Sequence, residues 1–201
     1  MGGKTPNLEG PDGRSTIRQT QCYARFMRVA VFGKPGGGKS TLGVKIAEAT
    51  GLTLYQLDLI QFKTGGMKVP DDVFAKQHAE ILAQPHWVLD GFGAPSYFEA
   101  MLGAADVLVY VERPPLVHYW WVTKRFLKSP FIKPLGWPEG SPMWHSTLSS
   151  YRFLKLSRKF WTPALKARLL ALQPGKRVYV IRCRSEEAAL LKELKVLVVG
   201  Q

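Results

Sequence analysis

Five short apolar runs recur along the 201-residue chain, and segments with helical spacing of apolar positions separate them. Each run is a predicted strand, and the runs lie near 28–32, 52–57, 87–91, 107–111 and 178–181. Helical spacing covers about 42–50, 70–82, 95–103, 116–127, 148–161 and 163–172, and a last helix begins near 185. Apolar strands that alternate with helices are typical of a parallel sheet covered on both faces. The pattern therefore predicts an α/β fold.

A glycine-rich stretch links the first strand to the first helix. It fits G-x-x-x-x-G-K-[ST], the phosphate-binding P-loop, in the strand–loop–helix context that this motif requires. Glycines let backbone N–H groups surround an anion, and the loop ends at a helix N-terminus, which favours negative charge. We therefore expect Mg·ATP, with Lys39 at the β- and γ-phosphates and the Ser40 hydroxyl on Mg²⁺. The residues expected to hold the nucleotide are Gly33, Lys34, Pro35, Gly36, Gly37, Gly38, Lys39, Ser40 and Thr41.

Acidic side chains follow three of the predicted strands. In an open α/β sheet, ligands bind beyond the carboxyl ends of the strands. Asp58 is therefore a candidate to hold a substrate hydroxyl or to act as a base, and a helix cap or turn is the alternative. Asp90 precedes Gly91 and is expected beside the P-loop, where it could organise Mg²⁺ through waters; a plain Asp-Gly turn is the alternative. Glu112 competes with Asp90 as the metal organiser.

Basic residues are concentrated in the second half of the chain. The net charge is +13, and residues 113–184 carry fifteen basic groups and one acidic group. Such a block suits nucleotide phosphates, nucleic acid or an anionic membrane surface, although a solvated basic face gives the same pattern. We expect Arg125 and Arg158 to act in catalysis by neutralising charge as a phosphoryl group moves, with Arg113 and Arg152 as further candidates.

Two segments lie outside the periodic pattern. Residues 1–26 predict a flexible tail, so that the predicted kinase-like domain spans 27–201. Prolines at 130, 134, 138 and 142 exclude a regular helix, and residues 128–147 are a candidate lid over the nucleotide. In the neighbouring helix Trp120 and Trp121 are expected in the core, and His78 is expected on a solvated face.

Cysteine usage and hydropathy indicate a cytoplasmic protein. Cys22 and Cys183 lie far apart without CxxC spacing, which predicts a reducing compartment with neither a disulfide framework nor a zinc site. No apolar run approaches the roughly 18 residues of a transmembrane helix, and the N-terminus lacks the apolar core of a signal peptide. We therefore expect no membrane partner.

From about residue 27 to 194 the chain resembles the adenylate-kinase-related P-loop proteins known as DNA topology modulation (FlaR-type) proteins. The resemblance rests on residues 33–41, Tyr55-Gln56-Leu57-Asp58, residues 87–91, the helix that carries Arg125, and Pro174-Gly175-Lys176-Arg177-Val178. It implies a P-loop NTPase fold like that of the nucleoside monophosphate kinases. That fold has five parallel strands in the order 2-3-1-4-5 with flanking helices. The resemblance also implies ATP binding and kinase activity.

One departure from the family concerns the acceptor. These families carry an arginine shortly after the Asp-Gly pair of strand three, and in adenylate kinases it grips the monophosphate acceptor. Residues 90–95 of this chain read Asp-Gly-Phe-Gly-Ala-Pro, without an arginine. The phosphate-gripping arginines must then come from elsewhere, and the departure argues against AMP as the acceptor.

We therefore predict an ATP-dependent, adenylate-kinase-like phosphotransferase that moves the γ-phosphoryl group to a small molecule, with nucleotides and nucleosides among the candidates. One alternative is a nucleotide-dependent nucleic-acid-binding or DNA topology-modulating protein that uses residues 113–184; it predicts binding that weakens steeply with salt. No recognisable nucleic-acid-binding motif accompanies that block. The other alternative is an ATP-binding regulator without transfer activity, against which Asp58 and Asp90 argue together.

Overall fold

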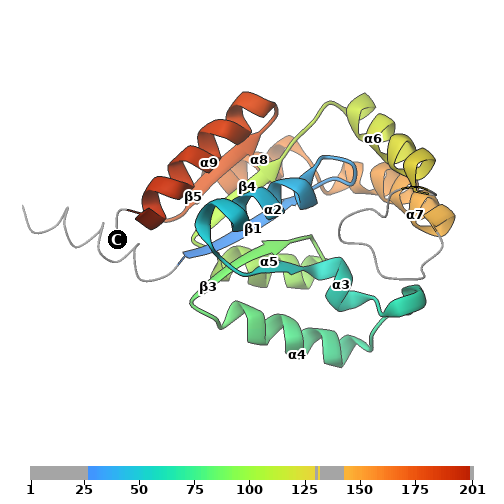
Figure 1. The fold of residues 1–201 in the computed structure, drawn as a ribbon, viewed down its shortest axis with the longest axis horizontal. Coiled ribbons are helices and arrows are strands. Elements are labelled where there is room, and N and C mark those ends of the chain that lie inside the picture. Colours follow the sequence, from blue (N-terminus) through green and yellow to red (C-terminus); the bar gives the residue numbers. More distant parts are fainter. Residues whose placement is uncertain (1–26, 130, 132–142, 200–201) are drawn as a thin grey trace, which may run out of the picture.

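A computed structural model describes residues 27–129, 131 and 143–199, which form one sheet with helices on both faces (Figure 1). The strands are β1 (Met27–Gly33), β2 (Leu54–Gln56), β3 (His86–Asp90), β4 (Val107–Val111) and β5 (Arg177–Ile181). All neighbouring strands are parallel, and their order is β2-β3-β1-β4-β5. The predicted fold class and strand order are confirmed.

The described residues form the seven predicted helices near the predicted places and one short helix, α3 (Leu57–Gln61), that was not predicted. The helices are α2 (Lys39–Thr50), α3 (Leu57–Gln61), α4 (Asp71–Leu82), α5 (Pro95–Ala104), α6 (Pro115–Lys128), α7 (Met143–Leu156), α8 (Pro163–Leu170) and α9 (Arg184–Val199), with short 3-10 turns η1 (Thr64–Gly66) and η2 (Ser157–Lys159). The second strand is shorter than predicted because the chain turns into α3 at the buried Leu57. The helix predicted over 148–161 begins earlier, at Met143, and ends in η2.

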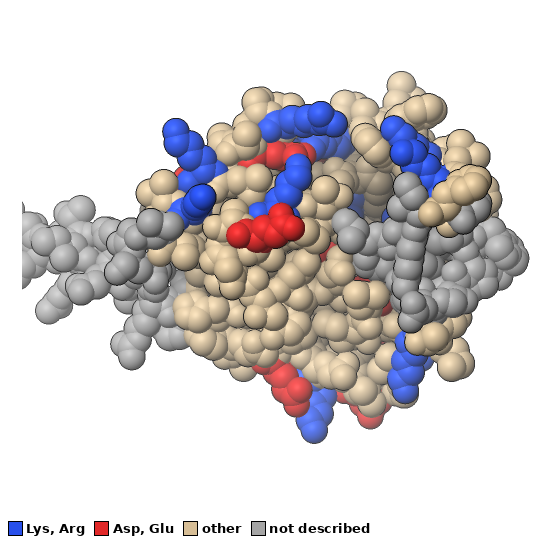
Figure 2. All heavy atoms as spheres, in the orientation of Figure 1, with Lys and Arg blue, Asp and Glu red and all other residues tan. Residues whose placement is uncertain are grey.

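The positive charge is not gathered into one patch on the face shown in Figure 2, where lysine and arginine side chains are spread over the upper and lower parts and acidic side chains lie among them. Several cations of the 113–184 block pair with carboxylates that lie outside it. These pairs are Arg113–Glu187, Lys166–Glu112 at 2.7 Å, Arg168–Glu99 at 2.6 Å and Arg182–Glu186 at 2.9 Å. The fold therefore neutralises part of the charge that looks uncompensated along the sequence.

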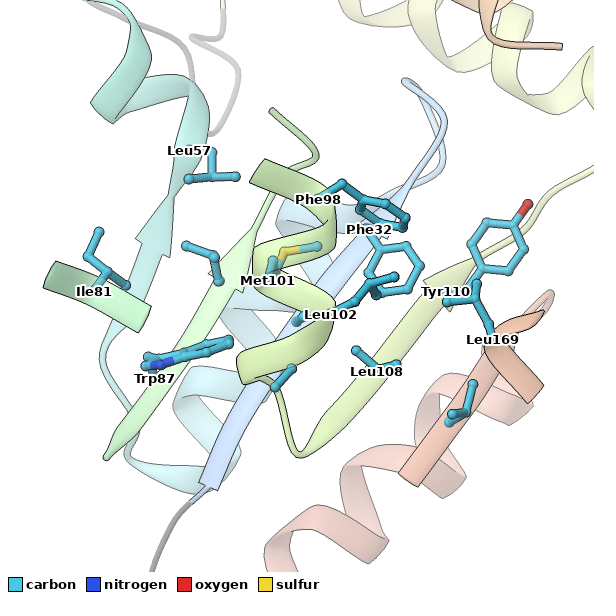
Figure 3. Close-up of a cluster of buried hydrophobic side chains, with 14 of the residues drawn as sticks. Phe32, Leu57, Ile81, Trp87, Phe98, Met101, Leu102, Leu108, Tyr110 and Leu169 are labelled. Atoms are coloured by element: carbon cyan, nitrogen blue, oxygen red, sulfur yellow. The ribbon is translucent and has the colours of Figure 1, made fainter. Parts of the chain in front are cut away.

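Apolar side chains fill the space on both sides of the sheet. On one face, α2 and α9 pack leucines and an isoleucine against the valines of the central strands. On the other face, α4, α5 and α8 cover a larger cluster that includes Phe32, Trp87, Phe98, Met101 and Leu108 (Figure 3). Because strands with both faces covered expose almost no side chain, the central strands read as continuous apolar runs.

The strand register brings the functional ends of the strands together. β1 is the central strand, with β3 on one side and β4 on the other. Val31 of β1 and Gln56 of β2 both lie opposite Asp90 of β3, and Gly33 lies opposite Val111 of β4. The P-loop therefore starts at the point where the chain connections diverge to the two halves of the sheet, which is where open α/β sheets bind ligands.

Two expectations about burial are wrong. Trp120 and Trp121 are 62% and 45% exposed, because α6 turns a different side inward, with His118 and Val122 buried. His78, expected on a solvated face, is 2% exposed and stacks against Phe74.

Two predicted segments are not described, or only in part. Residues 1–26, the predicted tail, lie outside the described residues. So does most of the candidate lid: of 128–147, only 128, 129, 131 and 143–147 are described, and the last five belong to α7. Among the described residues, no helix is long and apolar enough to cross a membrane.

Candidate active site

The glycine loop between β1 and α2 has the backbone geometry that its sequence predicts. Gly36 and Gly38 have positive φ angles of 70° and 89°, and α2 begins directly after Gly38. A Cβ at Gly33 would lie 2.3 Å from the Val111 carbonyl oxygen, so only glycine allows this strand end to approach β4. The loop therefore ends at the N-terminus of a helix, where free backbone N–H groups can bind an anion.

Lys39 is the cation at the centre of the site. Its Nζ donates a hydrogen bond to the Lys34 carbonyl oxygen at 3.0 Å, so its side chain lies back along the loop. Burial lowers the pKa of Lys39, the carboxylates of Asp90 and Asp58 act in the opposite direction, and Arg125 lowers it further. Four charged side chains from four different elements thus act on one another around the P-loop.

Asp90, at the end of β3, is buried beside the start of α2. Burial raises its pKa, whereas Lys39, the Ser40 hydroxyl and the Gln56 side chain act in the opposite direction. Its Oδ1 oxygen and the Gln56 Nε2 are both buried without a hydrogen-bond partner among the described residues. Buried polar groups are normally satisfied, so an unpartnered carboxylate oxygen next to a P-loop serine indicates a place for a ligand.

Asp58 opens α3 and lies on the same edge of the sheet. The residue is exposed to solvent, although protein groups lie close enough to its carboxylate to displace part of its hydration. The pKa of Asp58 is raised first by loss of solvation and then by the nearby Asp90, while Lys39 and Arg125 act against the rise. A carboxylate in reach of the P-loop lysine and open to solvent can meet an incoming hydroxyl group.

Arg125 reaches this cluster from α6. Its Nη2 donates to the Ser150 hydroxyl of α7 at 3.1 Å, and its Nε is buried without a partner among the described residues. Burial lowers the pKa of Arg125, and Asp58 acts in the opposite direction. The guanidinium group is therefore held in place with part of its hydrogen-bonding capacity free.

The remaining candidates are not part of this charged cluster, although Arg113 Nε donates to the Gly37 carbonyl oxygen of the P-loop at 3.5 Å. Glu112 binds Lys166 through Oε2 at 2.7 Å, and Arg113 pairs with Glu187. Arg152 and Arg158 are exposed, and neither has an ion pair within the described part of the chain. Neither acts on the pKa of Lys39, Asp58 or Asp90. The fold thus gathers the predicted P-loop, Asp58, Asp90 and Arg125, and leaves Glu112 and Arg158 outside.

Two residues of the site escaped the sequence reasoning. Gln56 stands at the same strand end as Asp58, and this position was a usable signal, because side chains at strand ends lie on the ligand edge. His118 has no such signal, since nothing near it in the sequence points to the P-loop. In the structure its ring meets the loop, with Nδ1 at 2.8 Å from the Pro35 carbonyl oxygen.

Comparison with solved structures places this arrangement among known folds. A protein of Chloroflexus aurantiacus, whose assignment as a kinase is itself provisional, superposes with a TM-score of 0.50 at 15% identity, covering 85% of this chain and 97% of that chain. The chain has the fold of the P-loop kinases. Shikimate kinase from Acinetobacter baumannii (TM-score 0.49, 19% identity, 90% and 97% covered) and a gluconokinase from Sinorhizobium meliloti (0.46, 16%, 88% and 93%) are also similar.

At these low sequence identities, the similarity to P-loop kinases concerns the fold alone. No family model matches the chain. No curated protein matches it either. The resemblance to DNA topology modulation proteins therefore stays a prediction that rests on the motifs alone.

The oxygen atoms near the P-loop suit Mg²⁺, which needs few protein ligands, better than they suit a metal ion whose ligands all come from protein. Within the described ranges, no group of three or more histidine, cysteine, aspartate or glutamate side chains could hold a metal ion. Magnesium typically needs one or two protein oxygens and takes its other ligands from water and substrate phosphates. The Ser40 hydroxyl and the unpartnered Asp90 Oδ1 supply that number of oxygens and fit this ion.

Proposed function

We propose that the protein binds Mg·ATP and transfers the γ-phosphoryl group to a hydroxyl group of a small molecule. One observation carries the proposal: Asp58, Asp90 and Arg125 all lie close enough to Lys39 of the P-loop to act on its ionisation. Two carboxylates and two cations at one phosphate site are what phosphoryl transfer uses, because it depends on positioning and on neutralising charge.

Each part of the cluster has a role in this proposal. The backbone of residues 33–41 cradles the phosphates, and Lys39 leaves the Lys34 carbonyl to reach the β- and γ-phosphates. Ser40 and Asp90 would hold Mg²⁺, which would offset the charge of the phosphates. Arg125 supports the transferring group.

Arg158 is the second arginine that we propose for charge neutralisation. It lies in η2, directly after α7, whose Ser150 holds Arg125. Because its side chain is exposed and outside the cluster, the role requires that it move toward the phosphates when nucleotide binds.

Asp58 is the proposed acceptor-side group. Its carboxylate accepts the proton of the substrate hydroxyl while that oxygen attacks the γ-phosphorus, and the bond to the ADP oxygen breaks. Its raised pKa follows from loss of solvation and from Asp90, and both would make it a better proton acceptor than an ordinary surface aspartate. The absence of an arginine in residues 90–95 favours an acceptor other than a nucleoside monophosphate.

The nucleic-acid alternative has less support in the fold than in the sequence. Part of the basic block is already paired with Glu99, Glu112, Glu186 and Glu187. Such ion pairs remove cations that would otherwise contact a phosphate backbone. The inert-regulator alternative does not use Asp58, so a measurement of turnover decides it.

The test is ATP consumption by the purified protein with a panel of nucleosides, nucleoside monophosphates and small hydroxy compounds, and with single-stranded and duplex DNA as separate additions. Acceptor-dependent ADP formation supports the kinase and names its substrate class. ADP formation that depends on DNA, or tight nucleotide binding without any turnover, contradicts it.

Lys39→Ala should weaken Mg·ATP binding about a hundredfold, because charge-assisted hydrogen bonds to the phosphates are lost. Isothermal titration calorimetry measures the affinity, and circular dichroism shows whether the fold is kept. Lys45→Ala is the matched control, since Lys45 is an exposed lysine of the same helix. Equal affinities for Lys39→Ala and the wild type would exclude the P-loop role.

Asp58→Asn should leave Mg·ATP binding within about threefold and lower kcat by about a hundredfold or more, because the amide cannot take a proton. Single-turnover kinetics with the acceptor found above measures the chemical step. Asp72→Asn changes an exposed aspartate of α4 and serves as the control. Full turnover by Asp58→Asn would remove Asp58 from the acceptor site.

A further inference from the structure

His118 lies where α6 meets the P-loop. It is 1% exposed, and its Nδ1 lies 2.8 Å from the Pro35 carbonyl oxygen, so the Nδ1–H donates to the loop backbone. The next two loop residues approach it closely. A Cβ at Gly36 would lie 2.6 Å from the His118 carbonyl oxygen, and a Cβ at Gly37 would lie 3.3 Å from the His118 Cε1. One residue of α6 thus touches three consecutive residues of the phosphate-binding loop.

We propose that His118 is a positioning residue that holds the P-loop in its phosphate-binding conformation and ties it to the helix that carries Arg125. This inference rests on the proposed function for its catalytic consequence. The part that concerns the conformation of the loop rests on the contacts between His118 and the loop alone. His118 does not reach the phosphates; it acts through the Pro35 carbonyl and through contact with Gly36 and Gly37.

The hydrogen bond fixes the Pro35 carbonyl of the loop against α6. A phosphate cradle needs N–H groups that point inward, so each loop carbonyl has to find a donor on the other side. At Pro35 that donor is the imidazole ring. If the donor is lost, a partly buried carbonyl is left without its partner, which favours a shift of the loop.

A neutral ring is the form that suits this place. Burial lowers the pKa of His118, and Lys39 and Lys34 act in the same direction, against the carbonyls of Pro35 and Arg113. The uncharged tautomer with its proton on Nδ1 keeps the donor that Pro35 needs. It places no further positive charge beside the two loop lysines.

The same side of α6 joins the loop to the charged cluster. His118, Val122 and Arg125 stand at i, i+4 and i+7, which is one face of a helix. Val122 is fully buried, and its Cγ2 would lie 3.0 Å from a Cβ at Gly36. About two helical turns therefore separate the loop contact from the guanidinium group. When the loop and α6 are fixed to each other at His118, the distance from the P-loop to Arg125 is fixed as well.

Three variants test the inference. His118→Leu removes the donor and keeps an apolar side chain of similar bulk, whereas His118→Asn offers an amide N–H near the place of Nδ1. His78→Leu is the matched control, because His78 is another buried histidine of a different helix, without a contact to the loop in the described structure. Mg·ATP and inorganic tripolyphosphate are the probes, measured by calorimetry.

We expect His118→Leu to weaken binding of both probes roughly three- to tenfold, which corresponds to one lost hydrogen bond. His118→Asn should stay within about twofold of the wild type, and His78→Leu should not differ from it. The inference is overturned if His118→Leu binds both probes like the wild type, if His118→Asn is as weak as His118→Leu, or if His78→Leu weakens binding equally.

A measurement without nucleotide separates this inference from the proposed function. Amide hydrogen exchange of the ligand-free protein, followed by mass spectrometry for the peptide that spans 33–42, should speed up in His118→Leu and not in His118→Asn or His78→Leu. If the wild type does not bind Mg·ATP, the proposed function fails, and faster loop exchange in His118→Leu alone still supports the positioning role. Unchanged exchange in His118→Leu overturns it.

Discussion

Two glycines with nearly the same backbone angle have different surroundings. Gly36 in the P-loop has φ 70° and Gly51 after α2 has φ 72°, a region that residues with a Cβ rarely adopt. A Cβ at Gly36 would lie 2.6 Å from the His118 carbonyl oxygen, whereas a Cβ at Gly51 would meet nothing within 4 Å. An alanine would therefore strain the backbone at both positions, but it would meet a steric clash only at Gly36.

Gly36→Ala should lower the free energy of unfolding by about 1–3 kcal/mol more than Gly51→Ala, because a steric clash is added to the same left-handed strain. Urea unfolding of both variants measures the difference. Gly36→Ala should also weaken Mg·ATP binding, while Gly51→Ala leaves it unchanged. Equal losses of stability would mean that the loop can move away from α6 at little cost.

At the scale of elements, α5 and α6 use their apolar residues differently. α5 turns Phe98, Met101 and Leu102 into the core, where Phe98 contacts the ring of Phe32 edge-on at 5.1 Å. α6 buries His118 and Val122 against the P-loop and leaves both of its tryptophans exposed. α5 therefore stabilises the sheet, whereas α6 shapes the site.

Phe98→Ala should lower the free energy of unfolding by about 3–5 kcal/mol, because a fully buried aromatic side chain leaves a cavity. Leu156→Ala, at an exposed apolar position at the end of α7, should stay within about 0.5 kcal/mol of the wild type. Chemical denaturation measures both variants. A loss below 1 kcal/mol in Phe98→Ala would contradict the packing described for α5.

At the scale of the whole molecule, charge is distributed in two ways. The chain carries a net charge of +13, and on the face in Figure 2 its cations lie spread out with acidic groups among them. The charges of the site, in contrast, form one dense cluster in which Lys39 and both aspartates interact. Salt screens exposed charges strongly and enclosed ones much less.

Binding of duplex DNA, if it occurs, should therefore fall steeply between 50 and 200 mM salt, as contacts to a phosphate backbone do. The affinity for Mg·ATP should change by less than about fivefold over that range, since the P-loop contacts are short and enclosed. Fluorescence anisotropy with labelled DNA and calorimetry with nucleotide measure how the two affinities change with salt concentration. A shallow salt dependence for DNA, or a steep one for Mg·ATP, would contradict this account of the charges.

Local signals in the sequence were enough to predict the strands and the phosphate-binding loop. The strands were predictable because buried parallel strands are continuous apolar runs, and the P-loop because its glycines stand between a strand and a helix. Asp58 and Asp90 were predictable as partners because carboxyl ends of parallel strands share one edge. Burial on α6 was not predictable, because the apolar residues of that helix do not show which side meets the loop.

The sequence by itself determined the fold class, the strand positions, the phosphate-binding loop and the two aspartates at the strand ends, since each depends on residues close together in the chain. Only the tertiary structure decided that Arg125, and neither Arg158 nor Glu112, lies with them. It also decided that His118 forms a hydrogen bond to Pro35 of the P-loop, although the two residues are 83 positions apart in the sequence. These contacts join segments far apart in the chain, and the way a helix turns when it packs, rather than any local pattern, selects them.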